Sequence, residues 1–190
     1  MILSHQLLCT INHSYATSRA THRTTNQLFG LDSDNYIGLL PQNNDWSETF
    51  ENHYINSRID PRILLAKKNG FLKSIDAAPL YKRLINIIPS EPPSLIHGDL
   101  WNGNVLFGTD GIAVLIDPAV SYSFREFDIA MMNLFQGFDQ VVFEIYIDIF
   151  PLEPNWKERL EIYKLYYLLV HLNMLGASYE ISGRTILEKY

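Results

Sequence analysis

Two acidic side chains and one amide have the spacing seen in enzymes that transfer phosphoryl groups. Residues 97–104 read His-Gly-Asp-Leu-Trp-Asn-Gly-Asn, so Asp99 precedes Asn104 by five positions, and Asp117 follows in an Ile-Asp-Pro sequence. An aspartate that accepts a hydroxyl proton, followed by an asparagine and an aspartate that bind magnesium, is typical of kinase-like chemistry. The pattern therefore predicts phosphoryl transfer to an acceptor hydroxyl.

A β-hairpin is expected to align these side chains. Residues 105–107 and 112–116 are apolar and rich in β-branched types, and the Asp-Gly dipeptide at 110–111 favours a two-residue type I′ turn. That turn would place Asn104 directly opposite Asp117, with their Cβ atoms about 4.5–5.5 Å apart. An amide oxygen and a carboxylate at this separation can share one divalent cation.

The connection between the two strands has an alternative form. A longer loop from Gly108 to Gly111 would change the pairing of individual residues. Asn104 and Asp117 would still lie at the same end of the ribbon.

The remaining polar residues have expected roles at the start of this motif. Asp99 is expected to be the base, because positioning of the acceptor contributes more than proton removal in a loose transition state. His97 is expected to brace the loop by hydrogen bonding. Asp128 opens an apolar helical pattern, so it either caps that helix or accepts hydrogen bonds from the loop backbone. Arg125 is expected to pair with Asp128 rather than to face a phosphate.

Several stretches resemble the fructosamine kinase (ketosamine-3-kinase) family, which is related to aminoglycoside and choline kinases. The resemblance runs from about residue 29 to the C-terminus. The shorter His-Gly-Asp motif is common to the related kinases, whereas Trp101 and the Asp-Asn-Tyr-Ile-Gly stretch favour fructosamine kinases. The similar stretches are 29–38, Pro41-Gln42, Trp46, 97–104, 116–119, 125–130, 158–163 and 166–173.

The resemblance implies a reaction and a set of roles. Members of this family use ATP to phosphorylate the sugar 3-hydroxyl of ketosamines, which form when glucose or ribose condenses with protein amines. The phosphorylated adduct then breaks down and frees the amine. Asp99 would be the catalytic base, Asn104 and Asp117 the magnesium ligands, and Trp101 a wall of the sugar site. The indole has an equally simple alternative role as a buried packing residue.

The expected fold is α+β and predominantly helical, like the C-terminal lobe of a protein kinase, with a small β-hairpin at the catalytic site. One domain over residues 1–190 is expected from the length. An N-terminal β-rich lobe is expected to be absent, because the chain has no Gly-x-Gly sequence for a phosphate-covering loop. Lys67 and Lys68 lie in a helical pattern, so neither is a good candidate for the nucleotide-binding strand lysine.

Apolar periodicity predicts a series of helices. Ser47 is expected to cap the second of them, and Tyr163, Tyr166 and Tyr167 are expected in the core. His171, on the same helix as these tyrosines, is expected to be a satisfied core histidine. The predicted helices cover residues 2–13, 47–69, 75–88, 126–136, 139–149, 155–177 and 184–190, with a polar loop over 14–27.

Composition excludes several other classes of protein. The net charge is −6 and no basic patch is interleaved with aromatic residues, so nucleic-acid binding is not expected. The longest strongly apolar run, 165–170, is too short to cross a membrane. A single cysteine, Cys9, and an N-terminus without a signal-peptide pattern favour the cytoplasm.

Two alternatives to an active kinase remain at this level. One is an inactive, truncated kinase lobe that acts at most as a binding or interaction module. Such a lobe is expected to expose apolar surface and to self-associate. The other is a metal-dependent phosphohydrolase, although the upstream Asp-x-His and the wider histidine set of a dinuclear site are missing.

Overall fold

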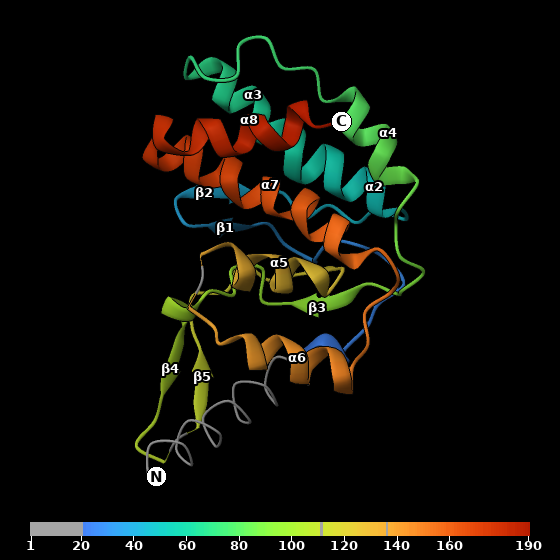
Figure 1. Cartoon of the computed structure of the whole chain (residues 1–190), viewed down its shortest axis with the longest axis vertical. Coiled ribbons are helices and arrows are strands. Elements are labelled where there is room, and N and C mark those ends of the chain that lie inside the picture. The colour runs from blue at the N-terminus through green and yellow to red at the C-terminus, as the bar shows by residue number, and fades with distance from the viewer. Residues whose placement is uncertain (1–20, 111, 136) are drawn as a thin grey trace.

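The computed structural model describes residues 21–110, 112–135 and 137–190. The predicted helix over residues 2–13, with Cys9, lies outside this part of the chain, as does much of the predicted loop 14–27. Helices dominate the described residues, and short strands connect them (Figure 1). The α-helices are α2 (Phe50–Asn52), α3 (Asp60–Lys68), α4 (Ala78–Ile85), α5 (Glu126–Leu134), α6 (Gln140–Ile149), α7 (Trp156–Leu175) and α8 (Glu180–Glu188).

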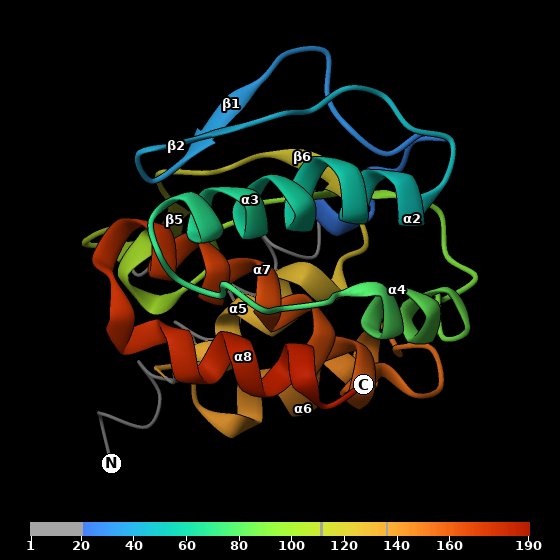
Figure 2. The same ribbon diagram turned by 90° about the horizontal axis from the view of Figure 1, so that it is seen from above.

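Helix α7 forms the centre of the helical part. It packs against α3, α5 and α8 (Figure 2), and the hydroxyl of its Tyr166 donates to Gln42 in the strand pair over residues 35–42. Tyr163, Tyr166 and Tyr167 are all buried, as predicted. The helix ends at Gly176, whose φ of 90° is a conformation that glycine adopts without a steric penalty.

The helical segment from residue 50 to residue 68 contains a widened turn. Between α2 and α3, residues His53–Ile59 form a π-helix, and the N–H of Asp60 donates to the carbonyl of Ile55. Pro61 follows and has no N–H, so it cannot donate a helical hydrogen bond. The wider turn lies directly before this position. The helix predicted for 47–69 is therefore present in three consecutive pieces.

The start of this segment differs from the prediction. The capping residue is Thr49, whose hydroxyl accepts from the N–H of Asn52, and not Ser47. Ser47 instead exchanges backbone hydrogen bonds with Phe29 and is committed to an extended conformation. Two other predicted helices have different bounds, since α4 is shorter than 75–88 and α8 starts at residue 180.

The described strands form three two-stranded antiparallel sheets. β1 (Asn35–Ile37) pairs with β2 (Leu40–Gln42), β3 (Ser94–Ile96) pairs with β6 (Ser121–Ser123), and β4 (Val105–Phe107) pairs with β5 (Ala113–Leu115). The β4–β5 ribbon projects away from the helical part (Figure 1).

The β4–β5 hairpin confirms the predicted ribbon but not its predicted register. Leu106 faces Val114, and the N–H of Gly108 donates to Ile112 O, so each residue is paired one position away from the prediction. The Asp110 side chain accepts from the N–H of Ile112, which stabilises a longer loop than the two-residue turn. Asn104 therefore pairs with Ile116, whose N–H donates to its carbonyl at 3.0 Å, and not with Asp117.

No helix among the described ranges is long and apolar enough to cross a membrane.

Candidate active site

Two chain segments meet at the base of the β4–β5 ribbon. Residues 97–104, which we call the catalytic loop after the role predicted for Asp99, follow β3. The last three residues of this loop, Asn102–Asn104, form a 3₁₀ turn that leads into β4. Asn104 directly precedes β4, Asp117 follows β5, and Asp99 contacts Asn104, so the three predicted polar residues lie around one end of the ribbon.

Asp128 holds the first part of the catalytic loop. Its two carboxylate oxygens accept from the N–H groups of His97 and Gly98, both at 2.8 Å, and Oδ2 also lies 2.8 Å from Nε2 of His22. Asp128 lies in the first turn of α5 and is fully buried. Asp128 was predicted either to cap the helix or to accept hydrogen bonds from the loop backbone. Its contacts are those of the second role, and Arg125 occupies the N-cap position.

The hydrogen bonds of Asp128 keep it ionised. Burial acts to raise the pKa of its carboxyl, but the hydrogen bond and charge of His22 and the contacts with His97 outweigh burial and lower the pKa overall. A carboxylate that accepts from two backbone N–H groups and one imidazole is well satisfied in a buried position.

The His97 side chain connects the two loops of the site. Its Nε2 lies 3.0 Å from the carbonyl oxygen of Ile116, and its Nδ1 accepts from the N–H of Asp99 at 3.3 Å. A carbonyl only accepts, so Nε2 carries the proton and the neutral tautomer satisfies both contacts. The imidazole thus joins the catalytic loop to the residue before Asp117.

Gly98 allows the two loops to approach closely. Its φ is 78°, and a Cβ added there would lie 2.1 Å from the carbonyl oxygen of Ala119. The N–H of Ala119 also donates to the carbonyl of His97 at 2.9 Å. Only glycine fits this position, because both the backbone conformation and the available space exclude a side chain.

Asn104 and Asp99 are in direct contact. The Asn104 amide nitrogen lies 2.9 Å from the backbone carbonyl of Asp99 and 3.2 Å from its Oδ2. Asn104 is buried and Asp99 is half-buried. Burial raises the pKa of the Asp99 carboxyl, and the hydrogen bond from Asn104 offsets part of that rise.

The oxygen donors near Asn104 suit a hard cation. Because the Asn104 amide nitrogen donates to Asp99, its amide oxygen is the atom that a cation would bind. Asp117 is exposed and has a φ of 51°, an unusual conformation for a residue other than glycine. Its neighbour Ile116 pairs with Asn104, so Asp117 lies at the same end of the ribbon. Amide and carboxylate oxygens are magnesium ligands, and these residues fit that ion chemically.

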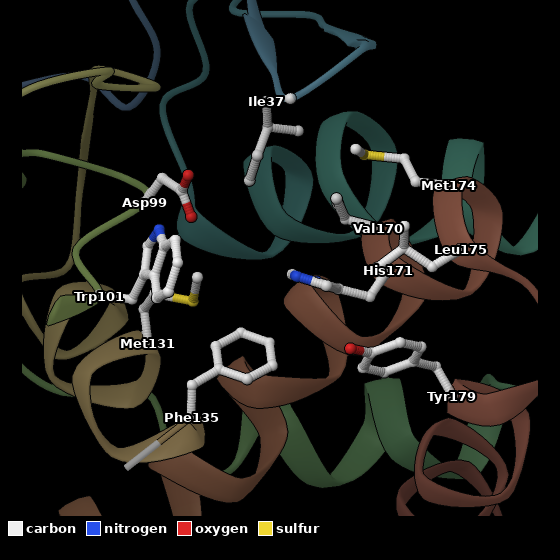
Figure 3. A pocket seen from close by; sticks show the side chains of 11 residues that line it. Ile37, Asp99, Trp101, Met131, Phe135, Val170, His171, Met174, Leu175 and Tyr179 are labelled. Atoms are coloured by element: carbon white, nitrogen blue, oxygen red, sulfur yellow. The ribbon is translucent and has the colours of Figure 1, made fainter. Parts of the chain in front are cut away.

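A cavity of about 340 Å³ lies beside Asp99. Figure 3 shows Asp99 and Trp101 on one side and His171 on the other, with Phe135 and Tyr179 completing an aromatic wall. Among the described residues that line it, Asp99 is the only acid and none is lysine or arginine. Trp101 is 39% exposed, so its alternative role as a buried packing residue is wrong.

His171 is not in the core, contrary to the prediction. Its Nδ1 lies 2.8 Å from the carbonyl of Tyr167, so Nδ1 is the protonated nitrogen. Nε2 is then an acceptor in the neutral ring, and the ring points into the cavity toward Asp99 and Trp101 (Figure 3). The prediction failed because His171 has the same helical spacing as the buried tyrosines of α7, although its side of the helix lines the cavity.

The strand pair that contains the Asp-Asn-Tyr-Ile-Gly stretch, residues 34–38, contacts the loop after Asp117. The Asn35 amide donates to the carbonyl of Val120 at 2.8 Å, and the Gln42 amide donates to Asn35 Oδ1 and to the carbonyl of Ala119. The hydroxyl of Tyr166 on α7 donates to Gln42 Oε1 at 2.6 Å. This hairpin therefore holds the loop that follows Asp117 against α7.

Two buried arginines stabilise the elements around the site. Arg125 pairs with Glu91 through two hydrogen bonds of 2.7 and 2.8 Å, so the predicted pairing with Asp128 is wrong. Arg159 pairs with Glu126 in the same bidentate way, with both distances 2.7 Å. Both arginines also donate to backbone carbonyls, which satisfies their remaining donors in the buried state.

Comparison with known proteins shows which family the chain is similar to. The family model described as fructosamine kinase matches residues 13–190. A protein of Enterococcus faecium named "Probable ketoamine kinase" is 43% identical over 175 residues, which are 89% of this chain and 63% of that protein. The mouse ketosamine-3-kinase is 33% identical over 166 residues, which are 84% of this chain and 52% of that protein.

A solved structure has the same fold. A Thermobifida fusca protein, provisionally assigned as a fructosamine-3-kinase, superposes with a TM-score of 0.85 at 35% identity, covering 95% of this chain and 64% of that one. The chain thus spans less than two thirds of the length of these relatives. The family match extends over nearly the whole chain, and the chain belongs to the fructosamine kinase family.

Proposed function

We propose that this chain carries the acceptor-binding and catalytic part of an ATP- and magnesium-dependent kinase that phosphorylates the sugar 3-hydroxyl of ketosamines. The observation that carries the proposal is the position of Asp99, on a braced loop and at the wall of a cavity that holds one acid and several aromatic rings. The phosphorylated adduct then decomposes and releases the amine, which is a deglycation reaction.

Asp99 is suited to receive the proton of the acceptor hydroxyl. Burial raises its pKa, which makes the ionised carboxylate a stronger base. The hydrogen bond from Asn104 and the rigid backbone on either side hold the carboxylate oxygens in one direction. Orientation of the hydroxyl toward the phosphorus is the larger contribution in a loose transition state.

Asn104 and Asp117 would hold magnesium, supported by the oxygen donors that they present at one end of the ribbon. Bound magnesium supplies charge neutralisation for the transferred phosphoryl group. The tight contact between Gly98 and Ala119 keeps the loops that carry Asp99 and Asp117 together.

The cavity is suited to a ketosamine, a polyol that carries a protonated secondary amine. Hydroxyl and ammonium groups are donors, and Asp99 together with Nε2 of His171 supplies acceptors on two sides. Aromatic rings favour an organic cation near their faces. Among the described lining residues there is no cationic side chain that would attract a sugar phosphate.

A second candidate is a ketosamine-binding module without kinase activity. The roughly half-exposed apolar side chains Leu106, Phe107, Ile112 and Val114 on the ribbon give this module a surface for self-association. We place either form in the cytoplasm, because Cys9 is the single cysteine.

The deciding experiment offers ATP, magnesium and a small fructosamine to the wild-type protein and to Asp99→Asn. Phosphorylation at the sugar 3-hydroxyl that falls about 100-fold or more in the variant supports the kinase. Calorimetric binding of fructosamine without turnover in either protein supports the binding module. Equal turnover in both proteins would remove Asp99 as the base.

The metal proposal has a separate test. Manganese, used in place of magnesium, is titrated and followed by its electron paramagnetic resonance signal. Asn104→Ala and Asp117→Asn are each expected to weaken binding about tenfold or more, while Asp148→Asn, at an exposed position on α6, is expected to have no effect. Unchanged affinity in both site variants contradicts the proposed ligand set.

A further inference from the structure

The Trp101 indole lies directly over Gly103. A Cβ added to Gly103 would lie 2.3 Å from Cη2, 2.4 Å from Cζ2 and 2.7 Å from Cζ3 of that indole. Real side chains do not approach so closely, so the ring occupies the volume that any other residue at 103 would need. The side chain of Trp101 has thus folded back onto the turn that follows it.

The conflict at Gly103 concerns only the indole. The three nearest atoms to the added Cβ all belong to the Trp101 ring, and Gly103 does not have a positive φ. Alanine is therefore compatible with the backbone of the 3₁₀ turn. The ring, which can rotate about its side-chain bonds, is the part that has to move.

The turn also lies close to a second glycine. The Asn102 side chain lies against Gly137, where an added Cβ would be 2.5–2.8 Å from its amide group. Gly137 has a φ of 142°, and its chain segment follows α5. The turn that contains Gly103 therefore contacts the segment after α5 as well as the Trp101 indole.

The far side of the indole continues the cavity wall. Trp101 meets Phe135 edge to face, with ring centroids 6.4 Å apart, and Phe135 meets His171 at 4.7 Å. Figure 3 shows these three side chains around one space, with Asp99 beside the indole. The position of the Trp101 ring therefore sets the shape of the cavity next to Asp99.

We infer that Gly103 is a positioning residue for acceptor recognition: the missing side chain at 103 provides the seat that keeps the Trp101 indole in the cavity wall. The inference rests on the proposed function, in which this cavity receives the ketosamine. Gly103 touches no acceptor itself and acts through the ring of Trp101.

The test combines a spectroscopic readout with a double-mutant cycle. The chain has three tryptophans, and Trp46 and Trp156 are replaced by phenylalanine, so that Trp101 is the single tryptophan and can be excited selectively over tyrosine. Gly103→Ala is expected to change its emission maximum and its quenching by acrylamide. Gly183→Ala is the matched control, because its added Cβ would make an ordinary contact of 3.9 Å with Leu169.

Affinity for a small fructosamine is measured in otherwise wild-type protein by calorimetry. Gly103→Ala and Trp101→Leu are each expected to weaken binding about tenfold. In the Trp101→Leu background, Gly103→Ala is expected to have no additional effect, because the ring that it displaces is absent. Manganese affinity is expected to stay within about twofold in Gly103→Ala, since Asn104 keeps its place.

Several results would overturn the inference. The first is unchanged Trp101 emission in Gly103→Ala. The second is a loss of fructosamine affinity in the double variant equal to the product of the losses in the two single variants. The third is a parallel loss of manganese affinity in Gly103→Ala, which indicates a distorted turn. If the wild-type protein binds no fructosamine, the proposed function fails, and the emission of Trp101 alone decides whether Gly103 seats the indole.

Discussion

The imidazole of His22 lies 2.8 Å from the carboxylate of Asp128, more than one hundred residues away in the chain. Both side chains are about 1% exposed. The other ring nitrogen of His22 lies 2.9 Å from the hydroxyl of Tyr146 on α6. This contact joins the first described turn of the chain to α5 and α6, directly behind the catalytic loop.

Asp128→Ala is expected to lower the free energy of unfolding by about 3 kcal/mol, because it leaves buried N–H groups and His22 without their acceptor. Urea denaturation measures the change. Asp148→Ala, at an exposed position on α6, is the control and is expected to change stability by less than about 0.5 kcal/mol. Similar stability of the two variants would show that the Asp128 contacts contribute little.

Asp99→Asn is expected to stabilise the protein at neutral pH. Burial raises the folded-state pKa of Asp99 above the unfolded value of about 3.9. The folded state then binds the proton more tightly, so stability falls as pH rises from the unfolded pKa to the folded pKa, and stays lower above it. Asparagine does not ionise and avoids this loss.

The measurement is the difference in unfolding free energy between Asp99→Asn and wild type at several pH values. The difference is expected to favour the variant increasingly as pH rises above about 4, and then to become constant. A difference that is independent of pH would mean that ionisation of Asp99 does not oppose folding. Asp148→Asn serves as the exposed control.

Gly98→Ala and Gly70→Ala separate two costs of replacing glycine. Both positions have positive φ, 78° and 91°, but only Gly98 has a backbone atom in the space of the new Cβ. Gly70→Ala is expected to cost about 1 kcal/mol through its conformation alone. Gly98→Ala is expected to cost at least about 2 kcal/mol more, because the loops carrying Asp99 and Ala119 must separate. Thermal or urea unfolding compares them, and equal losses would contradict the close loop contact.

His171→Asn and His171→Gln test the acceptor nitrogen in the cavity. The shorter asparagine amide can keep the bond to the Tyr167 carbonyl but offers nothing at the position of Nε2, whereas glutamine reaches that position. Fructosamine affinity, measured by calorimetry, is expected to fall about tenfold for asparagine and about threefold or less for glutamine. Equal affinities in both variants and wild type would remove His171 from the proposed contacts.

Local patterns in the sequence were enough for much of the fold. Apolar periodicity located the helices that became α5, α6 and α7, and the β-branched runs on either side of Asp110 located the ribbon. The register was wrong because the Asp110 side chain bonds to the N–H of Ile112 and favours a longer loop. A one-residue change in register moves every side chain of a strand to the other face, so local turn chemistry had a large effect.

The partners of the polar residues were harder to predict. His22, Glu91 and Glu126 lie far in the chain from Asp128, Arg125 and Arg159, and no local pattern marks them as pairs. His171 shares its helical spacing with buried tyrosines, so its place at the cavity depends on how α7 packs. The partners of Arg125 and Arg159 and the place of His171 depend on tertiary packing, which a local sequence pattern does not contain.

The bonds from Asp128 to the N–H groups of His97 and Gly98 also determine how the catalytic loop opens. Their amide hydrogens can exchange with solvent only when the loop separates from α5, a helix with seven buried residues. Hydrogen exchange at these two amides should therefore be as slow as exchange in the core. The loop that carries Asp99 would then unfold only together with the buried core around α5.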